Sequence, residues 1–127
     1  MTKYVLDASA LLAFLAGEPG GDAVEEALSL ALVSTVNMSE VIAKLLERTM
    51  SEDEVQEVVR YLDCEVVNFT LERAWRTARL RPLTRHKGLS LGDRACLSLA
   101  IEHDLPVMTT DRVWGLLDIG IAVNVVR

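Results

Sequence analysis

Short runs of β-branched and apolar residues alternate along this chain with longer segments whose apolar side chains recur at helical spacing. The short runs predict strands at residues 4–6, 32–36, 65–69, 107–109 and 121–125. Strands that alternate with helices are typical of a parallel sheet whose two faces are both covered. The pattern therefore predicts an α/β fold, a three-layer α/β/α sandwich with a central, mostly parallel sheet of four to five strands.

Local signals mark where the helices begin and end. Ser51 with Glu54, and Ser90 with Asp93, have the three-residue spacing of a capping box. Asp22 is expected to cap a further helix. The predicted helices cover residues 8–15, 22–30, 51–62, 71–78, 90–103 and 111–117, with another starting at Asn37. Pro82 and Gly88 predict that residues 81–88 form a basic loop.

The composition is that of an ordinary globular protein. The chain has 127 residues, half of them apolar and a quarter charged, which suits one domain over residues 1–127. No apolar run reaches the roughly 18 residues that a membrane span requires. The start of the chain leads straight into a strand, without the features of a signal peptide. We therefore expect a cytoplasmic protein.

The two cysteines do not indicate a disulfide framework or a zinc site. Cys64 and Cys96 lack the spacing of either. Cys96 falls on the apolar stripe of the helix predicted at residues 90–103, which is typical of a small core residue.

Four carboxylates carry the chemistry that the sequence suggests. Asp7, Glu40 and Asp111 stand at or just past the ends of predicted strands, and Asp93 lies at the start of a helix. Because ligands bind outside the carboxyl ends of parallel strands, we expect these acids to converge on one edge of the sheet. Each also has a local explanation, as a helix cap, as a partner of the helix dipole or, for Glu40, in a pair with Lys44.

Taken together, the four acids predict a site for a divalent cation. Asp93 heads an apolar stripe that contains no lysine or arginine, and Asp7 follows a strand expected to be buried. Semi-buried acids repel each other and raise each other's pKa, and Mg²⁺ or Mn²⁺ bound through oxygen would remove that strain. Such an ion can activate a water for attack on a phosphodiester.

The expected roles follow from these positions. Asp7 and Asp93 are predicted to ligate the metal, and Glu40 to ligate it or accept a proton from the attacking water. Asp111 is expected to ligate a second ion or to fix a metal-bound water. The hydroxyls of Ser9 and Thr110 flank two of the acids and would orient carboxylates or cap helices.

Four segments of the chain then resemble the acidic motifs of PIN domains, in particular VapC-type toxins of toxin–antitoxin pairs. The segments are VLDASALLAFL, NMSEVIAKL, LSLGDRACLSLA and VMTTD, spread between Val5 and Val125. The resemblance implies an α/β/α fold and a Mg²⁺- or Mn²⁺-dependent endoribonuclease whose motif acids are Asp7, Glu40, Asp93 and Asp111.

The same resemblance implies partners. It predicts a cognate VapB-like antitoxin and a homodimer, as expected of the toxin of a type II toxin–antitoxin system. Some members carry a further acid after the last motif, where this chain has Val113, Trp114 and Gly115. The RNA cut, the antitoxin and the number of ions stay open.

Charge is unevenly distributed. The net charge of −6 argues against a protein that coats nucleic acid through phosphate contacts. However, residues 73–87 contain six cations and no acid, and would guide RNA phosphates to the site or form a solvated face. Arg85 and Lys87, near the Asp93 helix, are the candidate substrate contacts. Trp75 lies on an apolar stripe and is expected in the core rather than stacked on a base.

Other functions fit less well. A haloacid-dehalogenase-like phosphatase needs a second aspartate where Ser9 stands, and a dinucleotide-binding domain needs glycines after the first strand. A response-regulator receiver needs an acidic pair near the first strand and a later lysine, and neither appears. The main alternative is a catalytically idle PIN-like module that binds a protein or RNA partner.

Overall fold

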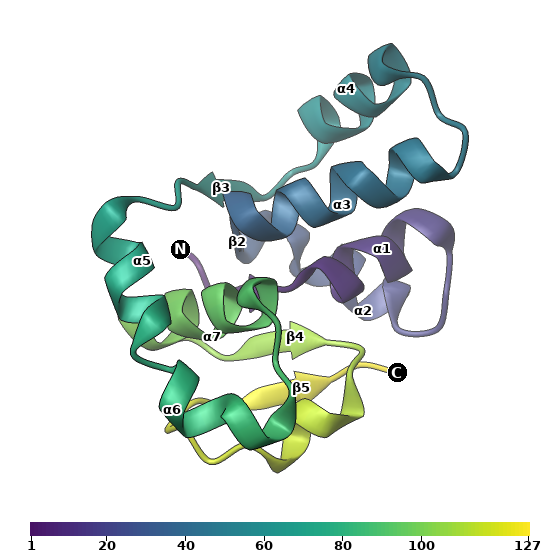
Figure 1. The fold of residues 1–127 in the computed structure, drawn as a ribbon. Coiled ribbons are helices and arrows are strands. Elements are labelled where there is room, and N and C mark those ends of the chain that lie inside the picture. Colours follow the sequence, from purple (N-terminus) through teal and green to yellow (C-terminus); the bar gives the residue numbers. More distant parts are fainter.

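A five-stranded parallel sheet lies at the centre of the molecule. The computed structural model describes the backbone of all 127 residues and every side chain except those of His86 and Leu116. All neighbouring strands pair in parallel, in the order β3-β2-β1-β4-β5 (Figure 1). The strands are β1 (Tyr4–Leu6), β2 (Ala31–Ser34), β3 (Glu65–Val67), β4 (Val107–Thr109) and β5 (Val123–Val125). The predicted fold class is confirmed.

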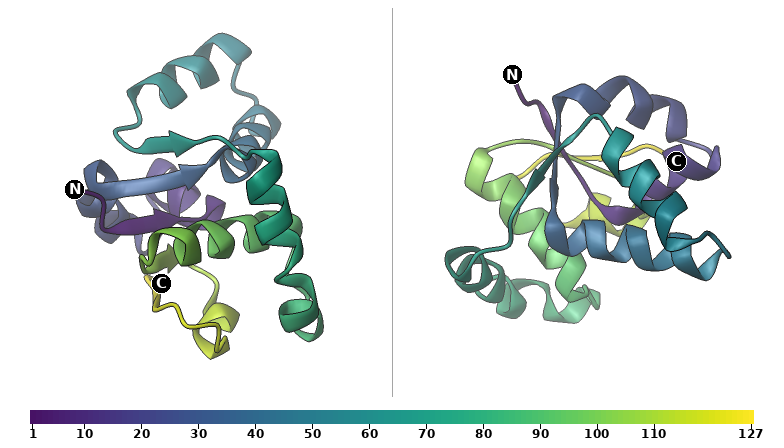
Figure 2. Two further views of the ribbon diagram at one scale, coloured as in Figure 1. Left: turned by 90° about the vertical axis from the view of Figure 1, so that its left-hand side faces the viewer. Right: turned by 90° about the horizontal axis from the view of Figure 1, so that it is seen from above.

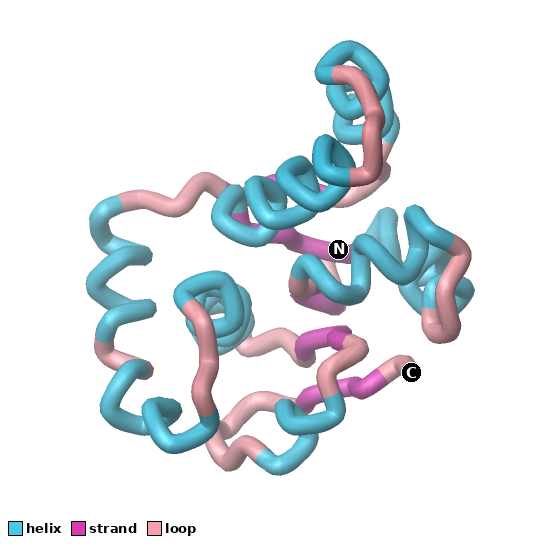
Figure 3. Tube along the Cα trace, turned by 45° about the vertical axis from the view of Figure 1, so that its right-hand side comes forward, coloured by secondary structure: helices cyan, strands magenta, loops and turns pink.

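Helices connect the strands and cover both faces of the sheet (Figure 2). Seven are α-helices: α1 (Ala8–Ala16), α2 (Gly21–Ala27), α3 (Thr35–Glu47), α4 (Glu52–Tyr61), α5 (Leu71–Ala78), α6 (Arg81–Thr84) and α7 (Leu91–His103). Three short 3₁₀ helices complete the elements: η1 (Leu28–Leu30), η2 (Arg85–Lys87) and η3 (Arg112–Leu116). Figure 3 shows the helices and the short central strands in different colours. In the described chain no helix combines the length and the apolar character needed to cross a bilayer.

The two capping boxes are confirmed, at Ser51 with Glu54 and at Ser90 with Asp93. Several other local predictions were wrong. Helix α2 has Gly20, not Asp22, at its N-cap, and α3 begins two residues before Asn37 because the Ser34 hydroxyl accepts from the Val36 amide. The predicted basic loop folds as α6 and η2, since a proline in the first turn of a helix removes no needed hydrogen bond.

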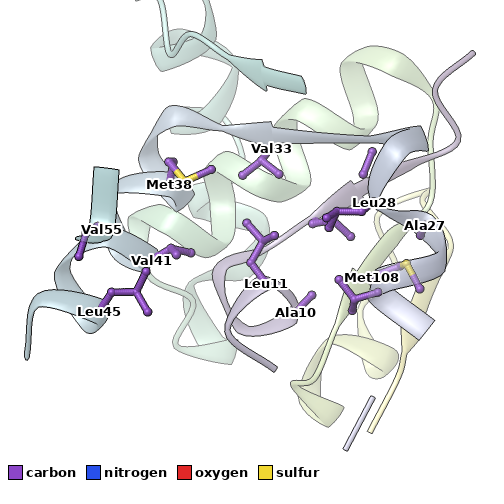
Figure 4. Close-up of a cluster of buried hydrophobic side chains, with 13 residues drawn as sticks. Ala10, Leu11, Ala27, Leu28, Val33, Met38, Val41, Leu45, Val55 and Met108 are labelled. Atoms are coloured by element: carbon purple, nitrogen blue, oxygen red, sulfur yellow. The ribbon is translucent and has the colours of Figure 1, made fainter. Parts of the chain in front are cut away.

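Alternation along the central strands divides the core in two. Val5 faces the cluster under α7, whereas Leu6 faces the cluster under α1 to α4. The second of these clusters is drawn in Figure 4, which shows Leu11, Val33, Met38 and Met108 packed between sheet and helices. Burial on both faces of the sheet fits the continuous apolar strands of the sequence.

Strand β1 lies in the middle of the sheet, between β2 and β4. Leu6 pairs with Met108 of β4, and the residue after Leu6 therefore emerges from a strand with neighbours on both sides. This central position explains why Asp7, at the carboxyl end of β1, retains only 4% of its accessible surface.

Candidate active site

A network of hydrogen bonds holds the buried carboxylate of Asp7. As the N-cap of α1, its Oδ1 accepts from the Ala10 amide at 2.9 Å and from the Ser9 hydroxyl at 2.8 Å. The Thr109 hydroxyl donates to the other oxygen, Oδ2, at 2.6 Å. Thr109 in turn accepts from the Asp111 amide at 3.1 Å. This one hydroxyl therefore connects the carboxylate after β1 to the backbone after β4.

Burial makes the ionised form of Asp7 costly. The pKa of Asp7 is raised from 3.8 to about 6, chiefly by desolvation on burial and to a smaller extent by the charge of Asp93. The hydrogen bonds from Thr109, Ala10 and Ser9 lower the pKa but do not cancel the effect of burial. A nearby cation would favour the ionised form.

Asp93 both caps helix α7 and belongs to the candidate site. One of its oxygens, Oδ2, accepts from the Ser90 amide at 2.9 Å, while the Asp93 amide donates to the Ser90 hydroxyl at 3.1 Å. This capping box fixes the carboxylate at the first turn of α7, which packs against β1 and α3. No described group donates a hydrogen bond to the other oxygen, Oδ1.

Asn37 joins Glu40 to α7. Its Nδ2 donates to Glu40 Oε1 at 2.9 Å and to the carbonyl of Gly92 at 3.0 Å. A β-carbon at position 92 would lie 2.6 Å from Cδ of Glu40, so only glycine leaves room for that carboxylate beside α7. Asn37 and Glu40 do not cap this helix, because Ser34 is its N-cap. The alternative pair with Lys44 is also not formed, since Lys44 contacts Glu47 at 3.5 Å.

Asp111 caps the turn after β4. Its Oδ1 accepts from the Val113 amide at 3.0 Å, and its side chain is exposed. Capping was one of the two roles expected for Ser9 and Thr110, and it falls to Asp7 and Asp111 instead. Ser9 contacts Asp7 through its hydroxyl, whereas Thr110 contacts Ser9 through its backbone amide.

One pocket of about 410 Å³ collects all four acids. Asp7, Glu40, Asp93 and Asp111 line it, from segments that are up to 104 residues apart. The other lining residues are Ala8, Ser9, Leu12, Asn37, Ala43, Lys44 and Glu47. Among the described residues, no three His, Cys, Asp or Glu side chains already stand at metal-binding geometry. The fold thus brings the four acids to one pocket, but their side chains do not already form a set of metal ligands.

Comparison with known proteins identifies this arrangement. The model of the PIN domain family matches residues 4–119. The chain belongs to the PIN domain family. This confirms the resemblance that the four sequence motifs suggested.

Solved structures share this PIN fold at low sequence identity. The DNA-bound VapBC complex from Salmonella typhimurium contains a chain with a TM-score of 0.73 and 20% identity, covering 97% of both chains. A toxin–antitoxin complex from Klebsiella pneumoniae gives a TM-score of 0.74 and 20% identity over 94% of this chain and 96% of that one. VapBC-5 from Mycobacterium tuberculosis gives 0.62 and 24%, over 100% and 99%. No curated protein matches by sequence.

The sequence did not indicate Thr109, which lies buried behind the pocket of this PIN domain and binds Asp7, or the role of Asn37 in joining Glu40 to α7. The pairing of Leu6 with Met108 places the next residues, Asp7 and Thr109, side by side. The strand register would have indicated Thr109 as the partner of Asp7, but the sequence alone does not give the register. The sequence therefore pointed to the neighbouring Thr110. Arg85 and Lys87, the candidate substrate contacts, lie in η2 and are not among the residues that line the pocket.

Proposed function

We propose that this PIN domain is a Mg²⁺- or Mn²⁺-dependent endoribonuclease and the toxin of a type II toxin–antitoxin pair. One observation carries the proposal: four carboxylates from four distant segments line a single pocket at the carboxyl edge of the sheet. Ligands bind at that edge in open α/β sheets. Membership of the PIN family, whose members are in general nucleases, supports the same conclusion.

The charge of the pocket suits a divalent cation. None of the four acids forms an ion pair with a described cation, and the one lysine that lines the pocket contacts Glu47 instead. The donors are all carboxylate oxygens, which Mg²⁺ and Mn²⁺ prefer to nitrogen and sulfur. Asp7, buried and with a raised pKa, is the group that a bound cation would stabilise most.

Each side chain has a place in the proposed hydrolysis. Asp7 and Asp93 would hold the cation, and Ser9 and Thr109 fix the orientation of the Asp7 carboxylate. Glu40 is exposed and held by Asn37, which suits it to ligate or to accept the proton of the attacking water. Asp111, which is exposed and lines the pocket, would orient a water there. The bound cation would activate the attacking water and offset the charge that develops on the phosphodiester.

An RNA cleavage assay tests this activity against the idle-module alternative. The purified chain should cut RNA when Mg²⁺ or Mn²⁺ is present, and excess EDTA should stop the cutting. RNA that stays intact with either metal, while the protein still binds RNA or a protein partner, would favour the idle module.

The toxin assignment and the partners are tested in cells. The structural neighbours come from VapBC and other toxin–antitoxin complexes, which supports a VapB-like antitoxin as a partner of this chain. We also propose that the chain forms a homodimer, as the resemblance of its motifs implies. Induced alone in bacteria, the chain should arrest growth, and Asp93→Asn should not. Co-expression of the neighbouring small antitoxin should restore growth. Normal growth with soluble wild-type protein present would argue for a nuclease outside toxin–antitoxin biology.

The contact between Gly92 and Glu40 predicts that Gly92→Ala separates stability from activity. Alanine favours the helix over glycine by about 0.5–1 kcal/mol, and the exposed Glu40 carboxylate can turn away from the new methyl group. We therefore expect an unfolding free energy equal to or above that of the wild type, but cleavage reduced about tenfold or more, because one positioned general base is worth about 10²–10⁴-fold.

Urea unfolding and a cleavage time course measure the two effects. Gly115→Ala is the matched control, because its β-carbon would meet only the Val125 side chain at an ordinary 3.7 Å. Full cleavage by Gly92→Ala would show that the position of Glu40 does not matter.

A further inference from the structure

The structure divides the basic segment 73–87 into paired and unpaired cations. Arg73 donates to both carboxylate oxygens of Glu102, at 3.1 and 2.9 Å, and Arg76 contacts Glu72 at 2.9 Å. The remaining cations form no ion pair with any described carboxylate: Arg79, Arg81, Arg85 and Lys87. Four uncompensated positive charges therefore follow one another from the end of α5 through α6 and η2.

Trp75 stands at the start of this series and is not in the core. The prediction that it packs inside was wrong, because 61% of its surface is exposed. It lines a hollow of about 470 Å³ together with Glu72, Arg76 and Arg79. Since Arg76 neutralises Glu72, Arg79 leaves this hollow with a net positive charge. An exposed indole beside an unpaired guanidinium offers both a stacking face and a phosphate contact.

The series leads to the acidic pocket. From α5 the chain continues into α6 and η2, and then rises to the first turn of α7 (Figures 1 and 3). Arg85 and Lys87 are eight and six residues before Asp93, which lines the pocket. A strand that leaves the pocket along this side of α7 would meet the cations in turn and reach Trp75 last.

The geometry points to α5, α6 and η2 as a binding track for single-stranded RNA, with one base stacked on Trp75 and phosphates on Arg79, Arg81 and Arg85. This inference rests on the proposed function, because it takes RNA as the substrate. The exposed indole favours RNA over a second copy of the chain, since a single strand offers both phosphates for the cations and bases to stack on Trp75, whereas an acidic protein surface offers only the charge. The stacking face adds affinity without reading sequence.

Tryptophan fluorescence tests the track directly. The chain has two tryptophans, and Trp114 has no exposed surface, so quenching on binding reports Trp75. The probe is a single-stranded twelve-nucleotide oligouridine, added in EDTA to the full chain carrying Asp93→Asn so that no cutting occurs. We expect quenching of Trp75. Fluorescence anisotropy of the same oligouridine carrying a dye measures the affinity of each variant, and in the same background Trp75→Ala should lose affinity by about 5- to 160-fold, the range that corresponds to one stacked base. Trp75→Phe should keep most of the affinity.

Salt dependence tests the phosphate contacts. On single strands each lost phosphate contact lowers the slope of log affinity against log salt by about 0.7, and Arg79→Gln should show that change. Two matched controls lie outside the track. Tyr61→Ala removes an aromatic that is 77% exposed on α4, and Arg48→Gln removes an exposed arginine at the end of α3. Both should bind like the parent.

Two results would overturn the track. One is equal RNA affinity in the Trp75→Ala and parent proteins. The other is a change of oligomeric state on Trp75→Ala with RNA affinity unchanged, which would make the hollow a contact between copies. Cleavage by the unsubstituted chain is measured separately with Mg²⁺. If the chain cuts RNA but its RNA affinity does not depend on Trp75, the proposed function holds and the track is wrong. If RNA affinity depends on Trp75 but the chain does not cut RNA, the track holds and the proposed nuclease activity is wrong.

Discussion

Asp93→Asn is expected to lower RNA cleavage by at least about 10³-fold while the chain stays folded. Loss of the charge weakens the hold on a cation that supplies several kcal/mol of transition-state stabilisation, and each 1.36 kcal/mol is tenfold in rate. The asparagine side-chain oxygen can still accept from the Ser90 amide, as the carboxylate does at 2.9 Å. The capping box, and with it the start of α7, is therefore retained.

Initial rates on a labelled RNA with saturating Mn²⁺ measure this loss, and circular dichroism checks the fold. Asp53→Asn is the matched control, because Asp53 lies in the first turn of α4 and does not line the pocket. Its rate should stay within about twofold of the wild type, as expected of a surface substitution. Cleavage that persists in Asp93→Asn would remove Asp93 from the metal site or reveal a contaminating nuclease.

Asp7→Asn is expected to stabilise the metal-free protein at neutral pH. The pKa of Asp7 is raised from 3.8 to about 6 by burial, so the folded state favours the protonated form. The stability gained from that proton is complete below pH 3.8 and is lost as the pH rises through about 6. At pH 7.5 the ionised group costs roughly 3 kcal/mol, at 1.36 kcal/mol per tenfold change in proton affinity.

Asparagine removes this cost and keeps the hydrogen bonds. Its oxygen can accept from the Ala10 amide and the Ser9 hydroxyl, and its nitrogen can donate to Thr109, whose hydroxyl can turn toward Ser9 at 3.2 Å. We expect a gain of about 1–3 kcal/mol in unfolding free energy at pH 7.5 in EDTA. The gain should shrink below pH 6 and vanish near pH 4.

Urea unfolding at pH 4, 6 and 7.5 measures the difference between wild type and variant. Adding Mn²⁺ at pH 7.5 should stabilise the wild type, because a ligand that binds only the folded state adds stability, and should stabilise Asp7→Asn much less. A variant that is less stable than wild type by the same amount at every pH would show that the lost charge was not destabilising. An equal gain from Mn²⁺ in both proteins would argue against Asp7 as a ligand.

Sequence reasoning reached the candidate acids because they follow local rules. Asp7 stands directly after β1, Asp111 stands two residues after β4, and Asp93 completes a capping box with Ser90 that the structure contains. These positions need no knowledge of distant residues. The supporting residues are different, because Thr109 reaches Asp7 across the pairing of β1 with β4, and Asn37 reaches the carbonyl of Gly92 from α3.

The local sequence patterns also gave wrong predictions of side-chain burial. Trp75 lies on an apolar stripe, but that stripe is wider than the surface that α7 covers, and the indole stays exposed. Arg73 and Arg76 looked like free cations in the sequence until Glu102 and Glu72 proved to be their partners. Exposure and charge pairing depend on which elements pack together.

By itself the sequence determined the strand and helix alternation, the parallel sheet and the four acids, because periodicity, capping and strand ends are properties of neighbouring residues. Only the tertiary structure decided that the acids share one pocket, that Asp7 is buried, and which cations remain unpaired. Those features depend on strand order and on helix packing, which join residues about a hundred positions apart. Solvent exclusion at such contacts, and not the local pattern, sets the pKa of Asp7 and leaves Trp75 at the surface.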